Sequence, residues 1–283
     1  MRALRFAVLG DPVAHSKSPA MHNAAFRTLG LPHRFEALRT SVDELPRIVS
    51  LLRDGTYQGL SVTVPHKQRV LSLVDALDES ARVAGAANIL VRDDDGRVTA
   101  HNTDAPALAE ELTRLSEGGL AGDAMMRALV LGSGGAARAA IVALSVHLGV
   151  RDIVVRARAF ADASLSHAFA STAPCAVALE TWIASHDGEE RTAAVIQCTS
   201  AGMHGADPGS AVADVVDWNA LPSNAVALDV VYAPRDTPWL LAARAHGLRC
   251  DDGLGMLARQ GALAWRLWLG MNAPLGVMRA ALE

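Results

Sequence analysis

The chain has 283 residues, of which 51% are hydrophobic and 20% charged, so it is long enough for two medium-sized domains with substantial cores. Its formal net charge of −4, without any run of lysine or arginine, excludes the usual basic footprint of a nucleic-acid-binding protein. The 3 cysteines and 10 histidines show no disulfide framework and no metal-ligand spacing, so no metal is expected.

The first hundred residues alternate short apolar runs with helical patterns, which predicts an α/β domain with a mainly parallel sheet. We expect strands at residues 6–10, 35–38 and 60–64, and helices at 18–29, 42–53 and 67–73. The apolar runs 88–91 and 98–102 flank an Asp-Asp-Asp-Gly turn, which predicts a hairpin at one edge of this sheet.

After a polar passage at 117–123, the pattern starts again with a second α/β unit. An apolar run ends at Leu131 and is followed by a glycine-rich turn and an alanine-rich helix. Further strand-like runs occur at 153–155, 194–197 and 225–231, and a closing helix is expected at 256–269.

Two apolar regions are too interrupted to enter a membrane. Gly10, Asp11 and Pro12 break the N-terminal stretch before a signal-peptide core forms, and Arg138 and His147 interrupt residues 128–150. We therefore expect a cytoplasmic protein.

The glycine-rich turn from Gly132 to Ala137 fits the dinucleotide-binding pattern G-x-G-x-x-A between a strand and a helix. Its backbone would approach a pyrophosphate at the helix N-terminus, and the alternative is a tight turn that only packs. The residues expected at the nucleotide are Gly132, Ser133, Gly134, Gly135 and Ala136.

Two arginines follow the next strand, where NAD-binding domains usually carry an acidic residue. Arg156 and Arg158 would suit the 2′-phosphate of NADP, because a guanidinium matches phosphate geometry. NADP is therefore favoured over NAD, and the alternative is two solvated loop arginines.

Residues 60–64 alternate apolar and hydroxyl side chains up to Pro65, and Lys67 follows at the strand end, where open α/β sheets place their ligands. Asp104 follows the strand expected at 98–102, so both side chains could reach one cleft. A lysine beside a carboxylate can serve proton transfer; two solvated surface groups are the alternative.

Ser16 and Ser18 stand where the first strand has ended and a helix begins. One serine suffices to cap a helix, so the second favours an anion site in which two hydroxyls bind a carboxylate.

Several motifs together resemble the shikimate dehydrogenase family, in the family's order and over nearly the whole chain. They are GDPVAHSKSPAMH, LSVTVPHK, AGAANIL, HNTDA, GSGGAARA, QCTSAGM, LDVVYAP with DTPWL, and DGLGMLARQGALAW. The resemblance implies a substrate domain of residues 1–104 plus 253–283, with C-terminal helices returning to it. It also implies a Rossmann-type NADP-binding domain of residues 105–252.

The resemblance further implies reversible reduction of 3-dehydroshikimate to shikimate by NADPH, in aromatic amino acid biosynthesis. Lys67 and Asp104 would form the catalytic pair. The implied substrate-binding residues are Ser16, Ser18, Thr63, Asn88, Asp104, Tyr232 and Gln260. Thr199, Ser200, Val230 and Gly253 would line the nucleotide with the glycine turn.

The sequence departs from the family at several of these motifs. Ser61 replaces a usual Asn, Arg156-Ala157-Arg158 replaces Asn-Arg-Thr, and Gln197-Cys198 replaces a common Asn-Ala. These changes leave open a quinate/shikimate or aminoshikimate dehydrogenase that uses NAD, and a ligand-binding homologue without catalysis. The partner expected is a small-molecule substrate, with no nucleic acid and no membrane, and monomer and homodimer both stay open.

Overall fold

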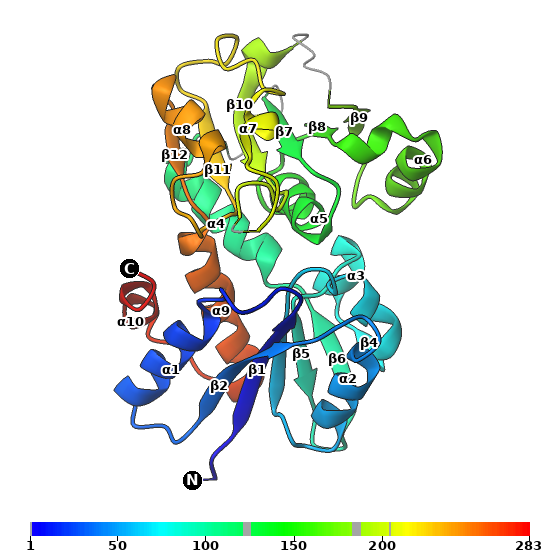
Figure 1. The fold of residues 1–283 in the computed structure, drawn as a ribbon, viewed down its shortest axis with the longest axis vertical. Coiled ribbons are helices and arrows are strands. Elements are labelled where there is room, and N and C mark those ends of the chain that lie inside the picture. Colours follow the sequence, from blue (N-terminus) through cyan, green and yellow to red (C-terminus); the bar gives the residue numbers. More distant parts are fainter. Residues whose placement is uncertain (1, 121–125, 183–187, 204) are drawn as a thin grey trace. The chain divides into compact units, whose positions relative to one another are not determined.

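The computed structural model describes residues 2–120, 126–182, 188–203 and 205–283. The chain forms two compact units, which Figure 1 shows as a ribbon. The first unit comprises Met1–Ala107 and Leu257–Glu283, and the second comprises Leu108–Met256. The junctions expected from the sequence, after residues 104 and 252, lie close to these bounds without coinciding with them.

The first unit contains a 6-stranded sheet in the order β2-β1-β3-β5-β6-β4. The strands are β1 (Arg5–Gly10), β2 (Arg34–Arg39), β3 (Gly59–Val62), β4 (Ala76–Leu77), β5 (Ile89–Arg92) and β6 (Val98–His101). Strands β1, β2 and β3 are parallel, whereas β5 runs antiparallel to both of its neighbours, β3 and β6. This sheet is therefore mixed, with a parallel half next to a hairpin.

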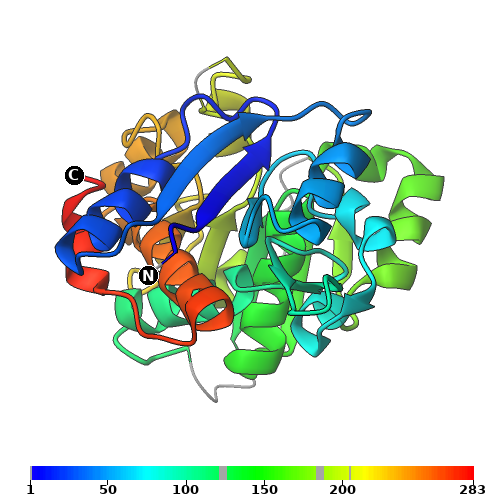
Figure 2. The same cartoon turned by 90° about the horizontal axis from the view of Figure 1, so that it is seen from below.

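Helices cover both faces of this sheet, as Figure 2 shows from below. They are α1 (Ser18–Thr28), α2 (Leu45–Arg53), η1 (Arg69–Leu73), α3 (Glu79–Ala84) and α10 (Leu275–Ala280). Two longer helices, α4 (Asp104–Leu115) and α9 (Leu254–Leu269), each have one end in this unit and the other in the second unit. Successive strand residues point to opposite faces: Ala7 and Leu9 pack with α2, while Phe6 packs with α1 and α9.

Aromatic side chains fill the face of the sheet under α1 and α9. Trp265 donates its Nε1–H to Nδ1 of His22 at 2.8 Å, and the His22 ring stacks on Phe35 with centroids 4.2 Å apart. Complete burial lowers the pKa of His22 to about 3, so the ring is a neutral acceptor. Trp268 lies against Gly59 and donates to the carbonyl of Leu90 at 3.0 Å.

The second unit contains a 6-stranded sheet in the order β12-β11-β10-β7-β8-β9. Its strands are β7 (Arg127–Leu131), β8 (Asp152–Arg156), β9 (Ala178–Glu180), β10 (Thr192–Gln197), β11 (Val226–Asp229) and β12 (Arg249–Asp251), all parallel. Counted within the unit, this is the 3-2-1-4-5-6 order of the Rossmann fold.

The remaining helices connect the strands of the second sheet. They are α5 (Gly135–Val142) with its continuation η2 (Ala143–His147), η3 (Arg158–Ala161), α6 (Ala163–Thr172), η4 (Glu189–Arg191), α7 (Ser210–Ala213) and α8 (Pro238–Ala245). Leu129 and Leu131 of β7 pack with Trp239 and Leu240 of α8 in one apolar cluster. The expected Rossmann-type architecture is confirmed.

Some local expectations are corrected. The hairpin β5–β6 is present, but β4 pairs with β6 beyond it, so the hairpin is not the sheet edge. The strand expected to reach residue 64 ends at Val62, and the helix expected at 67–73 is a 3-10 helix over Arg69–Leu73. All three cysteines are free, and in the described ranges no helix is long and apolar enough to cross a bilayer.

The close approach of Trp268 to Gly59 predicts a steric limit. A Cβ atom at residue 59 would lie 2.2 Å from Nε1 of Trp268, so Gly59→Ala should destabilise the protein by about 1–3 kcal/mol. Urea denaturation followed by tryptophan fluorescence would measure the shift in midpoint. The matched control is Gly276→Ala in α10, where nothing lies within 4 Å of the added atom and a helix former replaces glycine. Equal midpoints for both variants would contradict the prediction.

Candidate functional site

The topology of the first sheet places the expected site residues at one end of its strands. This is the carboxyl end of β1, β3 and β6, and β5, which runs the opposite way, begins there. The segments that follow or precede these strand ends carry the side chains Ser16, Ser18, Thr63, Lys67, Asn88 and Asp104. Strand direction thus brings residues that are far apart in the sequence to the same end of the sheet.

Lys67 and Asp104 form a close ion pair at this end of the sheet. Nζ of Lys67 lies 2.6 Å from Oδ2 of Asp104, and the two side chains are 16% and 4% exposed. Asp104 is the first residue of α4, where the helix dipole favours a negative charge. Lys67 is one of only two lysines in the chain, among many arginines. Because an arginine stays protonated in proteins and a lysine can release its proton, this pair is suited to proton transfer.

Asn88 connects the pair to its surroundings. Its Nδ2 lies 2.9 Å from Oδ1 of Asp104, 2.9 Å from Oγ1 of Thr103 and 3.2 Å from Oε1 of Gln260. The backbone N–H of Thr103 donates to Oδ1 of Asn88 at 2.7 Å. This network holds the carboxylate oxygen of Asp104 that Lys67 does not contact, and it brings Gln260 of α9 into the site. The sequence did not indicate Thr103, although it lies within a motif of the resemblance.

His66 holds the segment that carries Lys67, a contact that the sequence did not indicate. The ring is fully buried, and its Nε2 lies 2.7 Å from the carbonyl oxygen of Thr40, to which it donates. The backbone N–H of His66 donates to Thr63, and the carbonyl of Lys67 accepts from Ala87 at 2.8 Å. Lys67 therefore projects from a backbone that is fixed on both sides.

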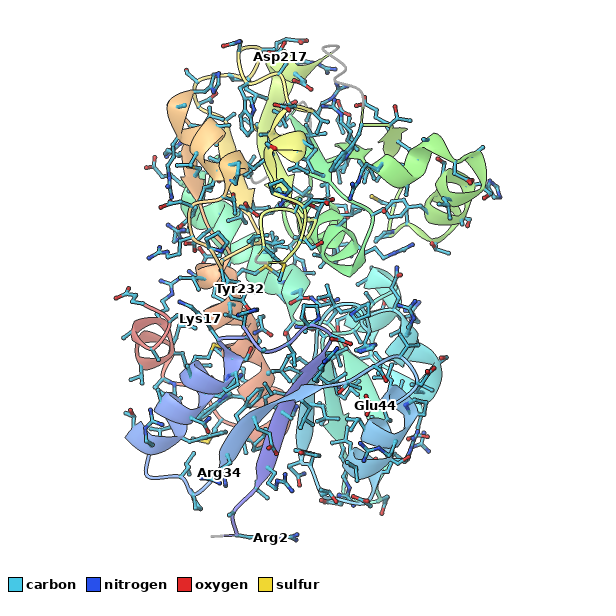
Figure 3. The ribbon with its side chains drawn as sticks, in the orientation of Figure 1. Arg2, Lys17, Arg34, Glu44, Asp217 and Tyr232 are labelled. Atoms are coloured by element: carbon cyan, nitrogen blue, oxygen red, sulfur yellow. The ribbon has the colours of Figure 1, made fainter. Side chains whose placement is uncertain are left out.

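Of the two serines, Ser16 lies in the segment between β1 and α1, and Ser18 is the first residue of α1. Ser18 is buried and its N–H donates to Oγ of Ser16 at 3.3 Å. Between them, Lys17, labelled in Figure 3, directs its ammonium to the carbonyl of Leu282. The second lysine is thus engaged with the C-terminal segment of the first unit, and the two hydroxyls stand at the start of a helix.

In the second unit, the glycine turn after β7 has the geometry that a pyrophosphate needs. Gly132 has φ +115°, which favours glycine, and its N–H donates to the carbonyl of Arg156 at 2.8 Å. A Cβ atom at Gly134 would meet nothing within 4 Å, so the space beside this backbone is open. Gly135 then begins α5, whose first amides point to the same end. These residues fit a dinucleotide.

Other residues expected at the nucleotide follow β10 and β11. A Cβ atom on Gly132 would lie 3.1 Å from Cγ2 of Thr199, so this threonine borders the glycine turn. Ser200 follows it and is exposed. After β11, a Cβ atom on Gly253 would lie 2.2 Å from the carbonyl oxygen of Val230, so these two backbones are in contact. Tyr232 lies two residues beyond Val230, half-buried in the second unit and labelled in Figure 3.

The two arginines after β8 have different environments. Arg156 is buried, and its guanidinium contacts Glu180 at 2.7 Å, Glu189 at 2.9 Å and the carbonyl of Val215. These contacts commit it to the interior, which does not agree with its expected contact with the nucleotide. Arg158 is 66% exposed and remains accessible from solvent.

Asp229 is a buried carboxyl group at the end of β11. Its Oδ2 lies 2.6 Å from Oγ1 of Thr237, and its Oδ1 accepts from the backbone of Val231 at 2.9 Å. Burial raises the pKa of Asp229 to about 7, against the opposing effect of these hydrogen bonds, and the nearby Asp252 adds to the increase.

Comparison with known proteins identifies the family. A protein from Methylobacterium radiotolerans named "Shikimate dehydrogenase (NADP(+))" is 38% identical over 93% of this chain and 90% of its own length. The chain belongs to the shikimate dehydrogenase family. A relative of the same name from Anaeromyxobacter dehalogenans is 40% identical over 100% of this chain and 96% of its own length. The resemblance found in the sequence is thus confirmed.

Two family models and a solved structure agree with this assignment. The shikimate dehydrogenase substrate binding domain matches residues 8–90, and the shikimate 5'-dehydrogenase C-terminal domain matches residues 253–283. The crystal structure of shikimate 5-dehydrogenase from Thermus thermophilus, in complex with NADP(H) and shikimate, is 35% identical with a TM-score of 0.81. The similarity covers 99% of this chain and 98% of that one.

The raised pKa of Asp229 predicts how the stability of this shikimate dehydrogenase family member depends on pH. Between pH 3.8 and about 7 the unfolded chain loses this proton while the folded chain keeps it, so the contribution to stability falls as pH rises. Asp229→Asn removes this dependence. The unfolding free energy of the variant minus that of the unchanged protein should therefore increase by on the order of 2–4 kcal/mol as the pH is raised from 4 to 8. Urea titrations at several pH values would measure the difference, and a difference that does not vary with pH would contradict the prediction.

Proposed function

We propose that the protein catalyses the reversible NADPH-dependent reduction of 3-dehydroshikimate to shikimate, in the cytoplasm and for aromatic amino acid biosynthesis. The observation that carries the proposal is the close, largely buried pair of Lys67 and Asp104 at the carboxyl end of β3 and β6. Nζ of Lys67 lies 2.6 Å from Oδ2 of Asp104. The curated relatives, named "Shikimate dehydrogenase (NADP(+))", favour shikimate and NADP over quinate and NAD.

Lys67 is the proton donor in this proposal. Bound NADPH supplies the hydride to the ketone carbon. As the carbonyl oxygen gains negative charge, the Lys67 ammonium transfers its proton to that oxygen and yields the hydroxyl group of shikimate. In the reverse direction, the neutral amine of Lys67 takes the hydroxyl proton back. Asp104 holds the ammonium in position and stabilises its positive charge.

The polar groups around the pair account for recognition of a small polyhydroxylated acid. Ser16 and Ser18 bind its carboxylate at the start of α1. The side chains proposed to bind its hydroxyl groups are Thr63, Asn88, Asp104, Tyr232 and Gln260. Asn88, Asp104 and Gln260 already form one network, so the substrate hydroxyls would join an existing set of oriented donors and acceptors.

The second unit would bind the dinucleotide, and the first unit the substrate. The open space at Gly134 and the N-terminus of α5 suit the pyrophosphate. The remaining residues proposed to line the nucleotide are Gly132, Ser133, Gly135, Ala136, Arg158, Thr199, Ser200, Val230 and Gly253.

Steady-state kinetics would test the proposal directly. Shikimate and quinate are each assayed with NADP⁺ and with NAD⁺, through the absorbance of the reduced nicotinamide. The highest kcat/KM is expected for shikimate with NADP⁺. Higher efficiency with quinate and NAD⁺ would assign the alternative activity, and the absence of reaction with all four combinations would contradict an oxidoreductase.

Replacement of Lys67 tests its role as proton donor. Lys67→Ala should reduce kcat about 10²- to 10⁴-fold with little change in the affinity for shikimate, because the proton is needed in the transition state. Lys67→Arg is the matched control: it keeps a positive charge beside Asp104 but cannot release a proton, so kcat should stay low. Near-normal turnover of Lys67→Arg, or equal losses in kcat and affinity for Lys67→Ala, would refute the assignment.

A further inference from the structure

An ion pair lies at the carboxyl end of the strands of the second sheet, beside the glycine turn. In the sheet order, β7 lies between β10 and β8. Arg158 follows the carboxyl end of β8, and Asp207 lies in the segment after β10. Nη2 of Arg158 is 3.0 Å from Oδ2 of Asp207. The pair therefore connects the two segments that flank the end of β7, where the glycine turn stands.

Arg158 also contacts an aromatic ring. Its guanidinium carbon lies 4.8 Å from the centroid of the Trp182 ring, in a cation–π contact. Trp182 follows β9, the strand beyond β8. Arg158 thus has a defined position at the strand ends. Because Arg156 is buried with Glu180 and Glu189, only Arg158 of the two arginines can reach a ligand there.

The partner of Arg158 is a carboxylate that solvent can reach. The side chains of Arg158 and Asp207 are 66% and 58% exposed. A guanidinium binds a carboxylate and a phosphate with the same donors, so a phosphate must displace Asp207 or share Arg158 with it. A ribose hydroxyl carries no charge and cannot replace the carboxylate in this way.

We propose that Asp207 is a specificity-determining residue that competes with the 2′-phosphate of NADP for Arg158. The inference rests on the proposed binding of a nicotinamide dinucleotide to this unit. When NADP binds, its 2′-phosphate takes the donors of Arg158 and leaves Asp207 without its partner. When NAD binds, the Arg158–Asp207 pair stays intact. Asp207 thereby lowers the preference for NADP over NAD that Arg158 alone would give.

A double-mutant cycle with Asp207→Asn, Arg158→Gln and the double variant tests the proposal. The dissociation constants of NADP⁺ and NAD⁺ are measured by isothermal titration calorimetry at low salt, without substrate. Asp207→Asn should bind NADP⁺ about threefold more tightly, which is the size expected for an exposed pair, and should bind NAD⁺ no more tightly. Arg158→Gln should weaken NADP⁺ binding at least about tenfold and leave NAD⁺ binding unchanged.

The cycle separates competition for Arg158 from a general change of charge. In the Arg158→Gln background, Asp207→Asn should have no effect on NADP⁺ binding. The control is Asp214→Asn, which removes another exposed carboxylate of the same unit and should leave both affinities unchanged.

Two results would overturn the inference while leaving the proposed function intact. They are an unchanged affinity of Asp207→Asn for NADP⁺, and an increase that persists in the Arg158→Gln background. If neither nucleotide binds to the unchanged protein, the proposed function fails, and this inference fails with it.

Discussion

The direction of the strands in the first sheet is the constraint on which the site depends. Lys67, Asn88 and Asp104 come from separate segments of the chain, and they meet because β3 and β6 end where β5 begins. The ammonium of Lys67 and the carboxylate of Asp104 then form a pair that is largely shielded from water. Removal of either partner would leave a charge in that environment, so position and charge depend on each other.

Side-chain hydrogen bonds around this pair give it little freedom. His66 donates to the carbonyl of Thr40, so the segment after β3 is attached to the segment after β2. Asn88 holds the other side of the Asp104 carboxylate. Such a site is oriented before the substrate arrives, and orientation in advance reduces the entropy that binding must overcome.

Much of this arrangement could be predicted from the sequence because the patterns concerned are local. Apolar alternation and glycine-rich turns predicted the two α/β units, and the motif order indicated the family. Strand β4 has only two residues, too few for a period to show, so the hairpin was placed wrongly at the sheet edge. The contact of His66 with Thr40 spans 26 positions and has no local pattern.

The two arginines after β8 show that the environment of a single side chain can also depend on residues far away in the sequence. Arg156 and Arg158 look equivalent in the sequence, but the partners of Arg156 lie 24 and 33 positions away, at Glu180 and Glu189. Only the folded chain shows that these carboxylates bury one guanidinium and that the loop carrying Asp207 reaches the other. A cofactor preference inferred from two arginines close together in the sequence therefore depends on the acidic residues that the fold brings beside them.

The scarcity of lysine has a practical consequence for studying this protein. With Lys17 engaged at the carbonyl of Leu282 and Lys67 at Asp104, isotopic labelling of lysine alone would give a spectrum of just these two ammonium groups. The resonance of Lys67 would report its ionisation directly as ligands are added, with Lys17 as an internal reference in the same molecule.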